Sequence, residues 1–311
     1  MNAARQLRIL LTHRPGGAWG FITDGLKNAF AYRGHIAERW DGNIQSWEEF
    51  QPDLAIMCSG HKQPIPPKRS AKVIIHVNPY GHQPIPGIDE TKDNIKWVLD
   101  QKPDAVFGYG HETDRHFWTH WTEKHGIPWI PVPTAADATI FKNLKKPKQY
   151  DIAYLGGHWS YKAKTIDAYL LPVLNKVKTY KIHGWGDWPS GICSGQLPDE
   201  QVNEFLNNGT ITPCISELHT HTHGIDIPER AFKVALCGGL VIHDNTQSIK
   251  KMIPSAIVTD NPNDFLDKCM YYLKNENERN IIAAKQESEV ALNNTYDSRI
   301  NTILQSINLL D

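Results

Sequence analysis

The stretch "FKNLKKPKQYDIAYLGG" (residues 141–157) decides the fold, because it separates two halves of the chain that follow the same pattern. Its first part is polar, rich in lysine and contains Pro147, as expected of a linker between domains. Its last part, residues 151–157, is a short apolar run that ends in two glycines, which is typical of a buried strand and the turn after it. The sequence therefore predicts a boundary near residue 144 and a new α/β unit beyond it.

Before the linker, short apolar runs alternate with stretches of helical periodicity. The predicted strands share strand-like length and β-branched or aromatic content, and they cover residues 7–12, 53–59, 72–78 and 104–110. Between them, residues 20–34 and 89–102 carry apolar side chains at helical spacing, and Gly34 ends the first helix as a C-cap would. Strand, crossover and strand in succession predict a parallel sheet with helices on both faces.

The same alternation follows the linker. The predicted strands cover residues 151–157, 179–184, 239–244 and 255–260, with helices over 165–177 and near 199–207. From Pro262 onward the pattern is helical, with Asp260 or Asn261 as the cap. We therefore expect two Rossmann-like, doubly wound halves whose ligands bind beyond the carboxyl ends of the strands, in a cleft between facing domains. The expected division is residues 1–144, residues 145–285, and a final helical segment, 286–311, that packs back on the first domain.

The composition is that of an ordinary globular protein of 311 residues, with 40% hydrophobic and 22% charged residues. Lys and Arg number 33 against 34 Asp and Glu, so no global field favours a polyanion. Nucleic acid is thus neither indicated nor excluded, because a local basic patch would still bind it. Four lysines of the linker are candidates for phosphate contact, although exposed lysines are usually only solvated: Lys142, Lys145, Lys146 and Lys148.

The five cysteines are scattered without a CxxC spacing, which indicates reduced thiols and not a disulfide framework. The apolar run from Ile9 to Leu11 is far too short for a signal peptide core or a membrane span. We therefore expect a cytoplasmic protein without a membrane span.

Residues 219–224, "HTHTHG", place three histidines at alternate positions, which would lie on one face of an extended chain. Imidazole is a common ligand of zinc, copper, nickel and iron. One hypothesis is therefore a metal-dependent hydrolase built on His219, His221 and His223. Such an enzyme needs a nearby carboxylate and a second cluster, and the sequence offers no H-x-x-E-H or H-x-D pattern elsewhere.

The segment "HGIDIPERAFKVALCGGLVIHDN" (223–245) predicts a helix that begins at the ligand-binding edge of the sheet. Asp226 and Glu229 have the spacing of a capping box, Pro228 suits the first turn, and Gly238 with Gly239 ends the helix before a β-branched strand. A helix N-terminus presents unpaired N–H groups and a partial positive charge, which favours phosphate oxygens. Capping alone is the alternative role for the two acidic residues.

Several segments resemble the GT-B glycosyltransferases, and among them the spore-maturation CgeB-like proteins. "RAFKVALCGG" (230–239) is similar to that group's R-x-F-E-x-x-A-C-G-G segment, and "YDIAYLGG" with Lys162 and Lys164 resembles its D-V-S-F-V-G strand and the basic residue after it. "KIHGWGDW" (181–188) resembles its G-x-G-W turn. Further similar segments are "PVPTAADATIF" (131–141) and "NPNDFLDKCMYYLKNENERNIIAAKQ" (261–286). The resemblance covers most of residues 128–300.

The resemblance implies a retaining glycosyltransferase (a hexosyl- or pentosyltransferase) that takes a sugar from a nucleotide diphosphate sugar, such as a UDP-sugar, and needs no metal or other cofactor. Lysine, arginine and helix-end amides would then stabilise the departing diphosphate. Glycines allow close backbone approach, and Trp185 or Trp188 is available for stacking. The residues expected to contact the donor are Gly157, Lys162, Lys164, Gly184, Trp185, Gly186, His221, His223, Gly224, Ile225, Asp226, Glu229, Arg230 and Lys233.

One residue departs from the family pattern. Related enzymes carry an acid at the fourth position of R-x-F-E, where it accepts hydrogen bonds from the ribose, and this chain has Lys233 there. A lysine has no acceptor, so Glu229 or Asp226 would have to take over that contact. The alternative is a non-catalytic binding protein that keeps the fold, and restoring glutamate at position 233 would then recover donor binding.

The N-terminal half is expected to hold the acceptor, which is a saccharide or a modified base in phage-type DNA. In the loop "THRPGGAWGF" (12–21), Arg14, Gly16 and Gly17 are predicted acceptor-side residues, together with Asn78 and His82. His76 and His111 follow predicted strands and are candidate catalytic residues, with Glu229 as the third. A histidine at a strand end is more often a hydrogen-bonded structural residue.

Overall fold

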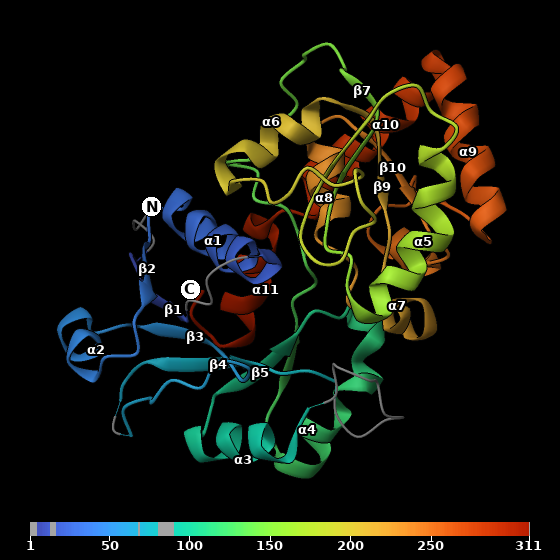
Figure 1. Cartoon of the computed structure of the whole chain (residues 1–311). Coiled ribbons are helices and arrows are strands. Elements are labelled where there is room, and N and C mark those ends of the chain that lie inside the picture. Colours follow the sequence, from blue (N-terminus) through green and yellow to red (C-terminus); the bar gives the residue numbers. More distant parts are fainter. Residues whose placement is uncertain (1–4, 13–16, 68, 80–89, 311) are drawn as a thin grey trace. The chain divides into compact units, whose positions relative to one another are not determined.

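The chain forms two compact α/β units, shown in the computed structural model of Figure 1. The structure describes residues 5–12, 17–67, 69–79 and 90–310. The first unit comprises Met1–Asp137 and Tyr296–Asp311, and the second comprises Ala138–Thr295. In the described part of the chain, no helix is both long and apolar enough to cross a membrane.

The first unit is built on a six-stranded parallel sheet in the order β2-β1-β3-β4-β5-β6. Most of its strand residues are buried, because helices cover both faces of the sheet. The strands are β1 (Arg8–Thr12), β2 (Ile36–Trp40), β3 (Leu54–Cys58), β4 (Lys72–His76), β5 (Ala105–Gly108) and β6 (Trp129–Pro131). The helices are α1 (Gly17–Tyr32), α2 (Ile44–Phe50), α3 (Lys92–Gln101), the 3-10 turn η1 (Glu112–Phe117), α4 (Thr119–His125) and α11 (Tyr296–Ser306).

Helix α11 is part of the first unit although it follows the whole second unit in sequence. Its apolar side chains, including Tyr296, Ile300 and Ile303, join the core formed by α1 and the sheet. The buried Arg299 donates hydrogen bonds to the carbonyl oxygens of Pro133 and Thr134, which anchors the helix next to the end of β6. The first unit therefore needs α11 to complete its core.

Gly25 in α1 makes this packing possible. A Cβ atom on Gly25 would lie 2.1 Å from Cδ2 of Tyr296, which is itself fully buried. We therefore expect Gly25→Ala to lower the free energy of unfolding by about 1–3 kcal/mol through overpacking. Denaturant unfolding measures this change, with Lys27→Ala in the same helix as the control. An unchanged unfolding midpoint for Gly25→Ala would contradict the packing of α11 on α1.

The second unit contains a five-stranded parallel sheet in the order β11-β10-β9-β7-β8. Helices α5 and α9 pack together, and α6, α8 and α10 form a second packed group, as expected of a doubly wound sheet (Figure 1). The strands are β7 (Tyr150–Leu155), β8 (Tyr180–His183), β9 (Gly209–Cys214), β10 (Leu240–His243) and β11 (Ile257–Val258). The helices are α5 (Ser160–Leu174), η2 (Asp199–Gln201), α6 (Val202–Asn207), α7 (Leu218–His223), α8 (Arg230–Leu236), η3 (Gln247–Lys251), α9 (Pro262–Lys274) and α10 (Glu276–Asn293).

The units divide after Asp137 and after Thr295, and not at residues 144 and 285. The lysine-rich segment is held on the second unit, where Asn143 donates to Glu287 of α10 and the Leu144 N–H group donates to Asn207 of α6. Helix α10 packs against α8 and β10 of the same unit, so only α11 returns to the first unit. The predicted cap of α9 is confirmed, since the Asn261 side chain accepts from two backbone N–H groups of its first turn.

Candidate functional site

The carboxyl ends of β7 and β9 mark where the strand order of the second unit reverses. The chain passes from β7 to β8 on one side, and then returns to place β9 on the other side of β7. In doubly wound sheets, ligands bind in the crevice at such a point. The segments that follow these two strands and their neighbours carry most of the residues that the sequence predicted to contact a donor.

Glycines bring the backbones of two of these loops together. A Cβ atom on Gly184, after β8, would lie 1.8 Å from the carbonyl oxygen of Gly156, after β7. Gly186 has a φ of 93°, and its Cβ would lie 2.2 Å from the carbonyl oxygen of His158. A Cβ on Gly157 would meet the Trp185 ring at 2.7 Å. Side chains at these positions would force the loops apart, so the glycines are required for the turn geometry.

Gly184→Ala tests this close approach of the two loops directly. We expect it to lower the free energy of unfolding by about 1–3 kcal/mol, because a backbone carbonyl cannot rotate away as a side chain can. Gly191→Ala is the matched control. Nothing lies within 4 Å of its added Cβ, so only its φ of 80° opposes alanine, at about 1 kcal/mol. Thermal unfolding that leaves Gly184→Ala more stable than Gly191→Ala would show that the two loops are not in contact.

A stacked pair of tryptophans lies on this edge, and one of the two is exposed. Trp185 is 51% exposed and stacks on Trp159, with ring centroids 5.9 Å apart and an angle of 15° between the planes. Trp188 instead packs edge-on against Tyr154 of β7. Of the two tryptophans predicted for stacking, Trp185 therefore presents the more accessible ring.

Two cations, Lys162 and Arg230, approach each other at the end of β7. Arg230 lies at the first position of α8, donates from Nε to the Leu155 carbonyl oxygen and stacks its guanidinium over the Tyr154 ring at 4.5 Å. Its Nη1 atom is buried and has no hydrogen-bond partner in the described part of the chain. Lys162, in the first turn of α5, is 8% exposed, and no carboxylate of a described residue lies within ion-pair distance of it.

The environment of Lys162 lowers its pKa from 10.5 to about 8. Burial is the largest cause, and the neighbouring charge of Arg230 adds to it, against weaker opposing effects from more distant carboxylates. A buried positive charge beside a second, half-buried one is unfavourable unless an anionic ligand joins them. The exposed Lys164, two residues further along α5, does not share this environment.

Glu229 and Lys233 form a buried ion pair in place of the predicted capping box. The Lys233 Nζ atom lies 2.8 Å from Oε2 of Glu229, and both side chains are less than one-tenth exposed. Helix α8 begins at Arg230 without a side-chain cap, and Asp226 adopts a left-handed φ of 58°, so the capping-box prediction is wrong. Its physical reason is that the carboxylate of Glu229 compensates the buried Lys233 charge one turn along the helix.

The "HTHTHG" stretch forms the short helix α7 and not an extended chain, so its three histidines do not share a face. His219 lies between two carboxylates, with Nε2 at 3.2 Å from Asp226 and Nδ1 at 3.6 Å from Glu217. His221 points instead to Asp244, and Gly224 ends the helix with a φ of 69°. Among the described residues, no group of three or more His, Cys, Asp or Glu side chains is arranged to hold a metal ion.

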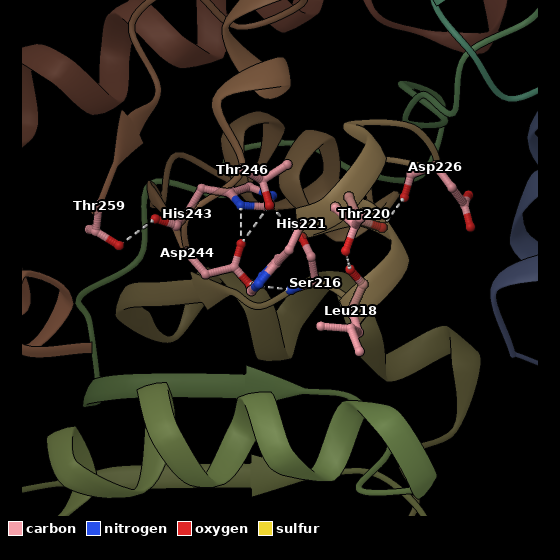
Figure 2. Close-up of polar contacts among 10 residues, drawn as sticks. Ser216, Leu218, Thr220, His221, Asp226, His243, Asp244, Thr246 and Thr259 are labelled. Atoms are coloured by element: carbon pink, nitrogen blue, oxygen red, sulfur yellow. Dashed lines mark hydrogen bonds and ion pairs between the residues drawn. The ribbon is translucent and has the colours of Figure 1, made fainter. Parts of the chain in front are cut away.

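Asp244 is the polar residue of this edge that the sequence reasoning missed. It follows β10, is fully buried and accepts hydrogen bonds from the side chains of His221, His243 and Thr246 (Figure 2). Burial alone would raise the pKa of this carboxyl group, but the imidazoles of His243 and His221 hold the pKa well below its usual range. A polar residue that directly follows a β-branched run was the only available signal in the sequence.

The remaining predicted donor residues lie next to these groups in sequence. His223 is the last residue of α7, and Ile225 is buried in the turn that leads to Asp226. The second unit thus brings together Gly157, Lys162, Gly184, Trp185, Gly186 and Arg230 around the ends of β7 and β8, while the other predicted donor residues lie along α7, α8 and the turn between them.

In the first unit, His76 lies at the end of β4, where its ring stacks on Tyr109 with centroids 4.3 Å apart. It lines a small cavity of about 30 Å³ together with Trp19 and Cys58. His111 caps η1 by accepting from the Thr113 N–H group, and the Asn78 N–H group donates to the buried Glu90. Gly17 is the first residue of α1, whereas Arg14, Gly16 and His82 lie outside the described residues.

Comparison with known proteins agrees with this geometry. The family model described as "Glycosyl transferase-like" matches residues 144–305, which is more than half of the chain. Comparison with curated proteins finds no match.

Three solved structures illustrate the likeness of fold. The phage T4 enzyme BGT in complex with UDP and Mn²⁺ is 11% identical, with 97% of this chain and 99% of that chain covered and a TM-score of 0.66. Sucrose-phosphate synthase from Thermosynechococcus elongatus is 10% identical, with 97% and 98% covered and a TM-score of 0.64. HepE of Anabaena, in complex with UDP and glucose, is 9% identical, with 98% and 100% covered and a TM-score of 0.61. The fold is thus GT-B, and the chain belongs to the glycosyl transferase-like family.

Proposed function

We propose that this protein transfers a sugar from a nucleotide diphosphate sugar to an acceptor hydroxyl. The observation that carries the proposal is the pair of cations at the switch point of the second unit, the buried Lys162 and the half-buried Arg230. A diphosphate supplies the negative charge that this pair lacks, and it adds phosphate oxygens as acceptors for the partnerless Nη1 of Arg230. The N-terminus of α5, which carries Lys162 in its first turn, adds a partial positive charge.

The other residues of this edge fit the rest of such a donor. The Trp185 ring offers a stacking surface for the nucleotide base, and the turns at Gly184 and Gly186 keep side chains away from the nucleoside. The segment from His221 to Asp226 would then face the phosphates and the sugar. Glu229 and Lys233 are already paired with each other, so in this proposal the donor's ribose is held by other groups.

We further propose that transfer is retaining, as the resemblance to retaining GT-B enzymes implies. We also propose that it does not require a divalent metal, because Lys162 and Arg230 take over the neutralisation of the leaving diphosphate. The Mn²⁺ in the complex of phage T4 BGT makes this a point to test. None of the five cysteines, all of which the structure describes, forms a disulfide bond, which fits a reducing compartment, so the proposed location is the cytoplasm.

In this proposal the acceptor binds to the first unit, with His76 and His111 as candidate catalytic groups. Asn78, after β4, and Gly17, at the start of α1, are candidate acceptor contacts. We favour a saccharide as the acceptor over a modified base in DNA. One neighbour is described as a DNA-modifying enzyme, but two linker lysines here are held within their own unit. Lys146 pairs with Glu204, and Lys148 donates to the Asn207 carbonyl oxygen.

Titration calorimetry with UDP, GDP, UDP-glucose and other nucleotide sugars tests the proposal. We expect micromolar affinity for at least one nucleotide diphosphate, the same affinity after treatment with EDTA, and a glycosylated product once a saccharide library is supplied. The absence of binding to every nucleotide would contradict the function, whereas EDTA-sensitive binding would contradict only its metal independence. Binding without any product would favour the alternative of a non-catalytic binding protein.

A further inference from the structure

The Asp244 carboxylate joins four parts of the second unit. It accepts from Nε2 of His221 at 2.7 Å, Nδ1 of His243 at 2.7 Å and Oγ1 of Thr246 at 3.0 Å, and also from the backbone N–H group of Ser216 (Figure 2). These donors come from α7, the end of β10, the loop after β10 and the segment after β9. Four donors on a fully buried carboxylate fix its position and keep it ionised.

His221 uses only one of its two ring nitrogens for this contact. Its Nδ1 atom makes no hydrogen bond to any residue that the structure describes, and 18% of its side chain is exposed to solvent. The ring of Tyr169, from α5, packs edge-on against it with centroids 6.0 Å apart. A carboxylate that accepts from Nε2 fixes the orientation of an imidazole and favours its protonated form, in which Nδ1 also donates, here to an anionic ligand.

Asp244 and His221, called the dyad below, lie at the edge of the sheet that holds the buried Lys162 and the half-buried Arg230. The pKa of the Cys214 thiol, at the end of β9, is raised mainly by burial. The charges of Arg230, Asp244 and Lys162 also act on this pKa. The negative charge of Asp244 also raises the pKa of Lys162, against the larger lowering effect of burial. The dyad and the cations therefore belong to one charged cluster, and a diphosphate bound by Lys162 and Arg230 would lie within it.

We propose that Asp244 is a positioning residue that holds His221 so that Nδ1 meets the phosphate that leaves the donor sugar. The inference rests on the proposed function. When the sugar is transferred, the bond between its anomeric carbon and the terminal phosphate oxygen breaks, and the electron pair stays on that oxygen. His221, as an imidazolium, donates from Nδ1 to this oxygen while Nε2 still donates to Asp244. The anomeric carbon bonds to the acceptor oxygen, whose proton passes to solvent.

Two replacements of His221 separate the roles of its two nitrogens. The amide of glutamine reaches close to the position of Nε2, so His221→Gln keeps a donor for Asp244 but lacks the group at Nδ1. The shorter asparagine places its amide near Nδ1, so His221→Asn leaves Asp244 without that donor. We expect His221→Gln to unfold near the wild-type temperature and to bind UDP about 10- to 100-fold more weakly, as for a lost charge-assisted hydrogen bond. Its affinity for UMP, which lacks the leaving phosphate, stays unchanged.

His221→Asn is expected to unfold at a lower temperature and to keep more of the wild-type preference for UDP over UMP. Asp244→Asn supplies the coupling test, because its neutral amide no longer compensates the imidazolium charge of His221, so the donor at Nδ1 is weakened. We expect Asp244→Asn to lower UDP affinity as much as His221→Gln does. The double variant should then be no weaker than either single variant, since both remove the same contact.

Three results would decide against the inference. If the wild type binds UDP or another nucleotide diphosphate and His221→Gln binds it equally well, the dyad does not contact the phosphate. If the losses in Asp244→Asn and His221→Gln add, Asp244 acts independently of His221. If the wild type binds no nucleotide diphosphate at all, the proposed function fails, and the inference that rests on it fails as well.

Discussion

Replacing Lys162 with methionine is expected to weaken UDP binding about 100-fold, because one partner of a buried ion pair with the diphosphate is removed. The same change is expected to raise the melting temperature of the free protein. In the free protein the Lys162 charge is buried beside Arg230 without a paired carboxylate, and methionine fills a similar volume without that charge. A gain of about 1 kcal/mol corresponds to about 2–4 °C for a unit of this size.

Lys164→Met is the matched control, since Lys164 lies on the same helix but is exposed. It should leave both UDP affinity and melting temperature close to the wild-type values. Calorimetry and thermal unfolding of the three proteins measure both quantities. If the two variants lose UDP affinity equally, the loss is a general effect of charge and not of a contact with Lys162. If Lys162→Met melts at a lower temperature than the wild type, Lys162 already has an anionic partner in the free protein.

The pH dependence of UDP binding provides a second readout of the same group. The pKa of Lys162 is lowered to about 8 in the folded protein, against 10.5 for an ordinary lysine. Below pH 8 the lysine is charged in the folded and the unfolded state, so the full cost of burial is present. Between pH 8 and 10.5 the unfolded state binds more protons, and this group contributes increasing stability as the pH rises. UDP affinity should fall over the same interval in the wild type and change much less in Lys162→Met.

Removing Lys233 is expected to have the largest effect on folding. Lys233→Met removes the charge that compensates the buried Glu229 carboxylate, and breaking such a buried ion pair typically costs about 3–5 kcal/mol. Lys233→Glu, which restores the residue of related glycosyltransferases, should be at least as destabilising, because it places two carboxylates in one buried site. Restoring the family residue alone therefore does not restore a ribose contact in this chain. Denaturant unfolding of each variant measures the loss.

Glu229→Gln combined with Lys233→Met is the control for this pair. Replacing both charges removes the unpaired carboxylate, so the double variant should recover most of the stability lost in Lys233→Met. If the double variant is as unstable as the sum of the single ones, the two side chains do not act as a pair. In that case Glu229 would be available to a ligand, such as the ribose of the donor.

The parallel sheets were predictable because most of their strands are short, apolar and bounded by glycine or polar turns. Residues 72–78 and 239–244 are examples, and both contain buried strands at those positions. The turns at Gly184 and Gly186 were also predictable, since glycine in a loop after a strand commonly allows close backbone approach. Both features depend on local sequence and need no knowledge of distant contacts.

The missed features depend on contacts between distant segments. Strand β9 (Gly209–Cys214) pairs with β10 and β7, yet its sequence contains two threonines and Pro213, which is unusual in an inner strand. Helix α7 has no strong periodicity, and its histidines are placed by carboxylates up to 23 residues away. The role of Asp244 follows only from the donors that converge on it from other segments. Such pairings leave no periodic pattern in a single sequence.

The return of α11 to the first unit has a consequence for biosynthesis. A ribosome makes residues 138–295 as one uninterrupted segment, so the second unit is able to fold as soon as that segment has emerged. The first unit, although translated first, lacks Tyr296, Ile300 and Ile303 until the whole second unit has been made. During that time α1 has an uncovered apolar face, and a nascent chain stalled before residue 296 would be the form most in need of a chaperone.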